Sequence, residues 1–302
     1  MTKSKLFLRN SAKPALLKLS FILFLVAGCS PSISPSYFRE DITQAIKDTY
    51  KKEYKADIYP KLVGKTLWIY LPIEDMVSGV DKKEKPSKYV ERFSIEENNN
   101  NFENGTFKLG YNIKIIPEKE KIQEVKIDDA VFKKINGVIM VLRRVLFSMH
   151  RAKAAEPNFI CVVTADIKNG FQMKQLSYYP DLKKVSYGFI GVEEYQHRSI
   201  NDISIEPKAV GDKEGLYLDY NDIEMADFIA AQIQYRIKLK FSKPEVKQSV
   251  DIDKEVLKIA AYTINIYGFK DFDSVELDNL ETNNKLSLNQ QAILVRSIEK
   301  RF

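Results

Sequence analysis

The chain has 302 residues, of which 44% are hydrophobic and 29% are charged, and its 47 basic and 41 acidic residues give a net charge of +6. A chain of this length can bury one sizeable core. It has only two cysteines, so its stability has to come from that core and not from a framework of disulfides.

The first 28 residues carry the three parts of a secretory signal. Residues 1–18 contain basic but no acidic side chains, residues 19–27 are mostly apolar, and small residues follow. A basic leader, a short apolar run and small residues before a cleavage point are typical of such signals. The basic residues of the leader are Lys3, Lys5, Arg9, Lys13 and Lys18.

The segment Val26-Ala27-Gly28-Cys29 resembles the lipobox of bacterial lipoproteins. In that class a lipid is attached to the cysteine thiol and the chain is cut just before it. The resemblance implies a signal peptide over residues 1–28, a lipid on Cys29 and a membrane anchor in the cell envelope. An Asp after the lipidated cysteine marks retention at the inner membrane in this class. Ser30 stands there instead, which favours the outer membrane, with the protein facing the periplasm.

An uncleaved transmembrane helix is the alternative interpretation of the apolar run. Crossing a bilayer takes about 20 mostly apolar residues. The run from Leu19 to Ala27 has nine, with Lys18 before it and Pro31 and Pro35 after it. A buried helix of a cytosolic protein would leave the basic leader unexplained. The sequence therefore favours the lipoprotein signal.

Removal of the leader changes the charge of the protein. Five of the 47 basic residues lie in it, so the mature chain keeps 42 basic against 41 acidic residues, a net charge of about +1. Net charge governs nonspecific attraction to anions. The mature chain gives no electrostatic reason to expect a nucleic-acid partner.

The mature chain is expected to begin with a tether and a helix. Residues 29–36 include a Ser/Pro stretch that favours an extended segment. Apolar residues at close to helical spacing predict a helix over residues 37–54. The apolar and aromatic run Leu67–Leu71 predicts a buried strand.

A half-buried strand is predicted over residues 107–115. Phe107, Leu109 and Tyr111 begin a strict alternation of apolar and mostly polar residues, which is the period of a strand. Asn104-Gly105 before it signals a tight turn. The run Asn98–Asn101 is expected to be a solvent-exposed loop tip, and a recognition loop is the alternative.

The clearest helix is predicted over residues 128–150. Its apolar residues recur at intervals of three and four, while Lys133, Lys134, Arg143 and Arg144 lie largely on other faces. We expect this helix to lie on a sheet, and a coiled-coil partner helix is the alternative. The apolar stripe consists of Val131, Ile135, Val138, Leu142, Val145 and Met149, widened by Ile139 and Leu146.

The second half of the chain predicts further strands and helices without regular alternation. An α+β fold with a mixed or antiparallel sheet, in one globular domain over residues 37–302, is therefore expected. Strands are predicted over 158–165, 185–192 and 216–220, and helices over 221–241, 252–266 and 288–301, the last capped by Ser287.

Motifs of known chemistry are missing from the sequence. It contains no nucleophile elbow, phosphate loop, Cys-x-x-Cys or His-Glu-x-x-His. Cys161 lies in an apolar run, unlike a catalytic thiol, and His150 at a helix end suits the helix dipole. Glu194 and His197 are three residues apart, but a metal site needs further ligands. No metal and no cofactor are therefore expected.

Tyrosines give the one hint of a binding surface. Tyr178, Tyr179, Tyr187 and Tyr195 cluster in the sequence, and a tyrosine offers a partner both an apolar face and a hydroxyl. Packing against the sheet is the alternative. Gly188 and Gly191 are interpreted as strand irregularities because no helix clearly follows them.

These observations favour a non-enzymatic envelope lipoprotein that binds or assembles with an envelope partner. The alternative is an envelope hydrolase that acts on cell-wall or carbohydrate material through Asp and Glu, because two carboxylates suffice for glycoside hydrolysis. The sequence nominates no such pair.

Overall fold

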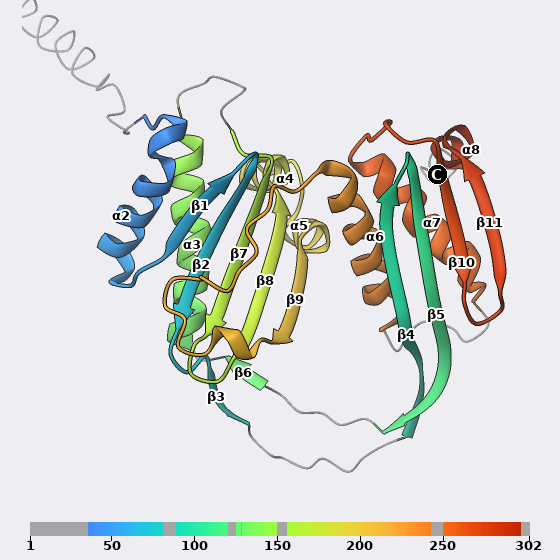
Figure 1. Ribbon diagram of the computed structural model, residues 1–302, viewed down its shortest axis with the longest axis horizontal. Coiled ribbons are helices and arrows are strands. Elements are labelled where there is room, and N and C mark those ends of the chain that lie inside the picture. Colours follow the sequence, from blue (N-terminus) through green and yellow to red (C-terminus); the bar gives the residue numbers. More distant parts are fainter. Residues whose placement is uncertain are drawn as a thin grey trace, which may run out of the picture.

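The computed structural model of the protein describes residues 36–80, 89–119, 125–127, 129–149, 156–242 and 250–296. Cys29, the signal peptide, the tether up to residue 35 and His150 lie outside the described residues. The expected α+β fold is confirmed. Helices and strands are interspersed along the chain, and the strands form two large sheets with both parallel and antiparallel pairs (Figure 1).

The first sheet has five strands, in the order β1-β2-β7-β8-β9. Only β2 and β7 are parallel. These two central strands are buried almost throughout, as strands covered on both faces are. The strands are β1 (Tyr59–Val63), β2 (Thr66–Ile73), β7 (Phe159–Asp166), β8 (Phe171–Tyr178) and β9 (Ile200–Ile205). Strands were predicted at β2 and β7.

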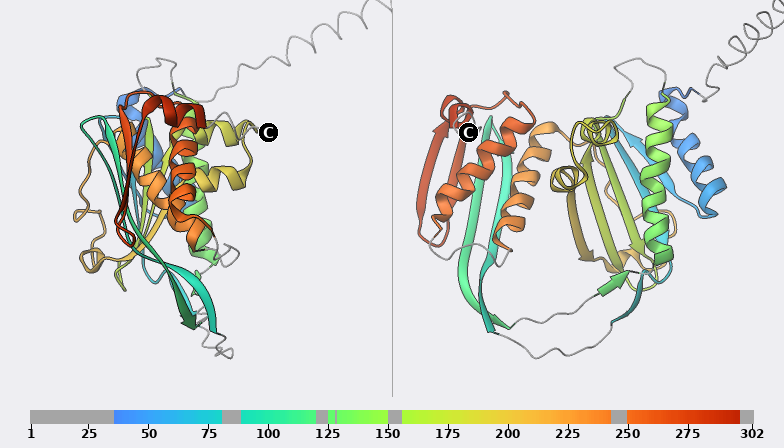
Figure 2. Two further views of the ribbon diagram at one scale, coloured as in Figure 1. Left: turned by 90° about the vertical axis from the view of Figure 1, so that its right-hand side faces the viewer. Right: turned by 180° about the vertical axis from the view of Figure 1, so that it is seen from behind.

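Helices α2 (Ile42–Tyr54) and α3 (Asp129–Phe147) cover one face of this sheet (Figure 2). A parallel strand pair needs a crossover connection, and α3 lies in the connection from β2 to β7. The predicted apolar stripe of α3 faces the sheet and α2. The apolar face of this helix therefore packs against other parts of the same chain. Gly137 of α3 lies against the ring of Tyr54, where a larger residue would clash.

The second sheet has four strands, in the order β11-β10-β5-β4. Its strands are β4 (Tyr89–Glu103), β5 (Thr106–Lys119), β10 (Ser274–Asn279) and β11 (Asn284–Asn289), and β5 and β10 are parallel. The β4–β5 hairpin lies in sequence between β3 (Val77–Val80) and β6 (Val125–Ile127), which pair with each other. Each large sheet therefore draws on two separate chain segments. The expected single domain stays a prediction.

The turn between β4 and β5 is confirmed, whereas the loop predicted before it is wrong. Asn104 and Gly105 have φ values of 49° and 76°, as a two-residue hairpin turn requires. The run Asn98–Asn101 lies within β4 and pairs with residues 108–111 of β5. The strong alternation of β5 supplies a partner strand, so the polar run is held in the ladder despite its low strand propensity.

Helix α6 (Met225–Phe241) connects the two sheets (Figure 1). Near its start Phe228 packs on Phe159 of β7, with ring centroids 5.0 Å apart. At its end Phe241 packs on Phe93 of β4, at 5.3 Å. One buried cluster thus runs from the five-stranded sheet through α6 into the four-stranded sheet.

The remaining helices are α7 (Ile252–Ile266), as predicted, and α8 (Gln290–Arg296). The predicted cap of the last helix is wrong: Ser287 pairs with Glu276 inside β11, and the side chain of Asn289 accepts the hydrogen bond from the backbone N–H of Ala292. Helix α6 begins four residues later than predicted. The carbonyl of Asn221, just before it, accepts a hydrogen bond from the indole N–H of Trp68 at 2.8 Å.

Two predicted strands are wrong. Residues 185–192 lie at the end of helix α4 (Tyr179–Ser186), in a turn and at the start of α5 (Val192–Arg198). Pro180 suits the first turn of α4. Residues 216–220 form a turn, a bend and irregular chain, and the carboxylate of Asp212 accepts hydrogen bonds from backbone N–H groups at 214, 215 and 217. Single-turn helices complete the fold at Arg39–Asp41 and Pro207–Ala209.

The packing of α3 predicts unequal effects of two truncations on the same helix. Leu142 is fully buried, so Leu142→Ala should lower the free energy of unfolding by about 2–5 kcal/mol. Met140 is half exposed, and Met140→Ala should lower it by less than about 1 kcal/mol. Urea unfolding followed by circular dichroism measures both. Equal losses would contradict the assigned buried face.

Candidate functional site

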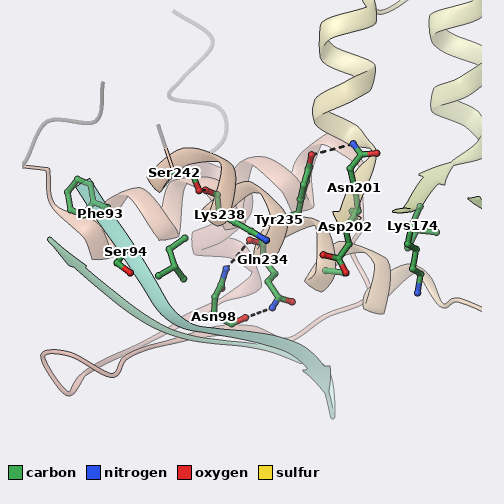
Figure 3. A pocket seen from close by; sticks show the side chains of 14 residues that line it. Phe93, Ser94, Asn98, Lys174, Asn201, Asp202, Gln234, Tyr235, Lys238 and Ser242 are labelled. Atoms are coloured by element: carbon green, nitrogen blue, oxygen red, sulfur yellow. Dashed lines mark hydrogen bonds between the residues drawn. The ribbon is translucent and has the colours of Figure 1, made fainter. Parts of the chain in front are cut away.

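A groove of about 670 Å³ lies between the two sheets (Figure 3). Its walls are β4 and the β8–β9 pair, and α6 lies between them. Both β4 and β9 are edge strands of their sheets. The lining residues are Phe93, Ser94, Ile95, Asn98, Lys174, Leu176, Ile200, Asn201, Asp202, Ala231, Gln234, Tyr235, Lys238 and Ser242.

Polar side chains of α6 fix both walls of the groove. The side-chain amide of Asn98 donates to the carbonyl of Gln234 at 2.9 Å, and the side-chain amide of Gln234 donates to the carbonyl of Asn98. On the other wall the amide of Asn201 contacts the Tyr235 hydroxyl at 3.4 Å. These contacts attach α6 to β4 by two hydrogen bonds and to the first residues of β9 by one (Figure 3).

Charged groups in the groove are unevenly balanced. Lys174 and Lys238 contribute two ammonium groups, and Asp202 is the one carboxylate among the described residues of the lining. Lys174 faces Asp202 across the β8–β9 ladder, and its ammonium lies 5.2 Å from the centroid of the Trp68 ring. Neither lysine has a carboxylate oxygen within 4.0 Å among the described residues. The groove therefore has a surplus of positive charge.

The chemistry of the lining suits binding. Amides of Asn98, Asn201 and Gln234 both donate and accept hydrogen bonds, while Phe93 and Ile95 provide apolar surface. No histidine or cysteine belongs to the lining. In the part of the chain that the structure describes, no three His, Cys, Asp or Glu side chains are placed to hold a metal ion.

Three of the four tyrosines flagged in the sequence are partly or fully buried. The Tyr179 hydroxyl donates to the carbonyl of Leu146 at 3.3 Å, and the Tyr195 hydroxyl lies 3.4 Å from that of Ser177. Tyr178 packs among aromatic rings at the end of β8. Burial raises the pKa of all three phenols. These three tyrosines therefore agree with the alternative interpretation, in which they pack within the fold.

Tyr187 alone of the four is exposed, at 63%, and its ring stacks on Phe147 of α3. The four tyrosines therefore do not form one exposed surface. The glycines beside Tyr187 were misinterpreted. Gly188, with a φ of 76°, follows the end of α4, and Gly191 directly precedes α5.

The Glu194–His197 pair belongs to a structural network. Glu194 accepts a hydrogen bond from Arg198 at 2.7 Å, and Arg198 also donates to the buried Asp181 at 3.1 Å. The carbonyl of His197 accepts from the side chain of Gln232 at 2.7 Å. This network joins α4, α5 and α6. Within this network the carboxylate of Glu194 forms an ion pair with Arg198.

Sequence reasoning missed the groove because its lining comes from distant segments. Residues 93–98, 174–176, 200–202 and 231–242 meet only through the packing of α6 between the sheets. One signal was present: the asparagine run was named as a candidate for recognition, and Asn98 lies in the lining. Polar residues in a paired strand often have a specific partner. That consideration would have pointed to Asn98.

Comparisons with protein-family models, with curated proteins and with solved structures found no match for this chain. A separate search of the described residues found no helix that is both long and apolar enough to cross a membrane.

Cys161 should be unreactive in the folded protein. Its side chain is fully buried, and burial raises the pKa of the thiol to about 12, which leaves almost no thiolate at pH 8. In the form that lacks residues 1–35, Cys161 is the sole cysteine. An aromatic disulfide reagent should modify this form at least about 100-fold more slowly in buffer than in urea. Equal rates would contradict the burial of Cys161.

Proposed function

We propose that the protein is a lipid-anchored lipoprotein of the cell envelope that binds an envelope partner in the groove between its two sheets. The groove carries the binding part of the proposal. The anchor is placed on Cys29, with the folded part facing the periplasm from the outer membrane. No catalytic step is assigned.

The anchor rests on the order of features in the first 29 residues. A basic leader, an apolar run and the lipobox-like Val26-Ala27-Gly28-Cys29 follow one another as in lipoprotein signals. A single acyl chain gives only marginal membrane attachment, whereas two or more hold a protein stably. Lipidation at Cys29 would thus be sufficient to anchor the protein.

Binding is favoured over hydrolysis by the make-up of the groove. Glycoside hydrolysis needs two carboxyl groups that flank the scissile bond, about 5–9.5 Å apart. Among the lining residues that the structure describes, Asp202 is the one carboxylate. By contrast, amides, apolar side chains and two ammonium groups line one concave surface, as a binding site requires.

The anchor is tested by replacing the cysteine. The protein expressed in a bacterial host should partition into membranes and carry acyl groups at a new N-terminus, and Cys29→Ala should abolish acylation and cleavage. The form lacking residues 1–35 should be soluble and folded. Mass spectrometry of the N-terminus and membrane fractionation measure these outcomes. A truncated form that still sediments with vesicles in high salt would place the anchor elsewhere.

The groove is tested by photo-cross-linking in intact cells of the source bacterium. Benzoylphenylalanine in place of Tyr235, in the lining, should give a light-dependent adduct of defined mass, because the partner lies against this side chain. The control is the same replacement at Leu216, which is 82% exposed and outside the lining. The absence of any adduct, or the same adducts at both positions, would remove the groove as the binding site.

A further inference from the structure

We infer that the partner enters the groove as an extended peptide segment that pairs with the free edge of β9, with apolar side chains on one face and acidic side chains on the other. This inference rests on the proposed binding function and names the chemical class of the partner. Three features lead to it: the unpaired edge of β9, its apolar outer face, and the ammonium groups of Lys174 and Lys238 in the groove on the side of its inner face.

The outer edge of β9 is open. Among the described strands, β9 pairs with β8 alone, over Ile200–Ile205 and without a register shift. Alternate backbone N–H and C=O groups of an edge strand point away from the sheet and can pair with another chain. Proteins commonly block such edges with Pro, Lys or a bulge. Residues 200–205 contain no Pro and no Lys, and the ladder has no bulge; the one charged side chain of the strand is Asp202, which lies opposite Lys174 of β8.

The outer face of β9 is apolar and exposed. Ile203 and Ile205 are 60% and 80% exposed. On the neighbouring strand they face Met173 and Phe171, which extend the apolar surface toward the core under α3. Helix α3 lies over the β2–β7 side of this face, and α4 and α5 lie over one end of the sheet (Figure 2). A strand added to β9 would cover both isoleucines with its own apolar side chains.

The inner face of β9 points into the groove. Asp202 alternates with Ile203 along the strand and so lies on the opposite face, beside Lys174. Lys238 of α6 lines the same space. An added strand would point every second side chain toward these two ammonium groups. Acidic side chains at those positions would compensate the surplus positive charge.

A second copy of the protein that pairs through its own β9 would match these two faces poorly. In the full six-residue antiparallel register, Asp202 of one copy stands opposite Ile203 of the other, so that polar and apolar faces mix. Other registers shorten the ladder. An extended peptide with alternating apolar and acidic residues places apolar side chains over Ile203 and Ile205 and acidic side chains in the space that Lys174 and Lys238 line. Pairing through the main chain with side-chain selection is an established mode of peptide recognition.

The probe is a labelled heptapeptide of sequence TVEVEVT, blocked at both ends and titrated against the full-length lipidated protein in detergent by fluorescence anisotropy. A matched peptide carries N-methyl groups on alternate residues and keeps every side chain. Loss of main-chain donors should weaken its binding at least about tenfold. The peptide TVKVKVT should also bind at least about tenfold more weakly. Equal affinities of the methylated and unmethylated peptides would overturn edge pairing.

Two pairs of variants locate the binding. Ile203→Lys should abolish binding of TVEVEVT, whereas Leu216→Lys, at an even more exposed apolar residue, should not. Lys238→Glu should reverse the preference in favour of TVKVKVT, whereas Lys213→Glu, at an exposed lysine outside the lining, should leave it unchanged. Circular dichroism confirms that each variant is folded. Equal effects within either pair would overturn the inference.

Further outcomes separate the inference from the function on which it rests. Amide hydrogen exchange at residues 202–205 should slow when TVEVEVT binds, and unchanged exchange would overturn pairing with β9. A dimer that Ile203→Lys dissociates, detected by sedimentation, would identify a second copy as the occupant and also overturn it. An adduct at position 235 without peptide binding would overturn the peptide class alone. Failure of both experiments would remove the binding function as well.

Discussion

The structure depends on one helix that packs against two sheets at once. Near one end of α6, Phe228 contacts Phe159 of the five-stranded sheet, and at the other end Phe241 contacts Phe93 of the four-stranded sheet. Burial of these rings removes a large apolar area from water on both sides. Both sheets are therefore held to the same helix. Their edge strands β4 and β9 face one shared space.

The groove follows from this constraint together with the polar residues of α6. A helix that packs on two sides still has a third side, which carries Gln234, Tyr235 and Lys238. Gln234 exchanges two hydrogen bonds with Asn98, so α6 attaches to the edge of β4. Tyr235 reaches only Asn201, at the start of β9. The two edges thus differ: β4 is attached to the helix, and the remainder of β9 stays free.

Sequence patterns predicted the helices and strands whose own periodicity is strong. They failed where contacts with a strand or side chain elsewhere in the sequence determine the local structure. The stripe of α3, the alternation of β5 and the turn at Asn104-Gly105 are local signals, and the structure confirms them. The asparagine run is a strand because β5 pairs with it, and the turn at residues 216–217 forms where the carboxylate of Asp212 accepts a hydrogen bond from the N–H of Tyr217. Apart from the asparagine run, the groove had no local signal. Its lining meets only after both sheets pack on α6.

The start of the described chain and the groove lie at opposite sides of the five-stranded sheet (Figure 1). The described chain begins beside α2 and α3, where the N–H of Tyr37 donates to the carbonyl of Ser148. Residues 29–36 span at most about 27 Å when fully extended, so the anchor would keep the α2–α3 side close to the membrane. In sheet order β1 and β9 are the two edges, separated by four strand spacings of about 4.8 Å. A segment paired with β9 would add one further spacing and lie about 24 Å from β1. An anchor at Cys29 would then restrict where the protein sits without occupying the edge at which the proposed partner would pair.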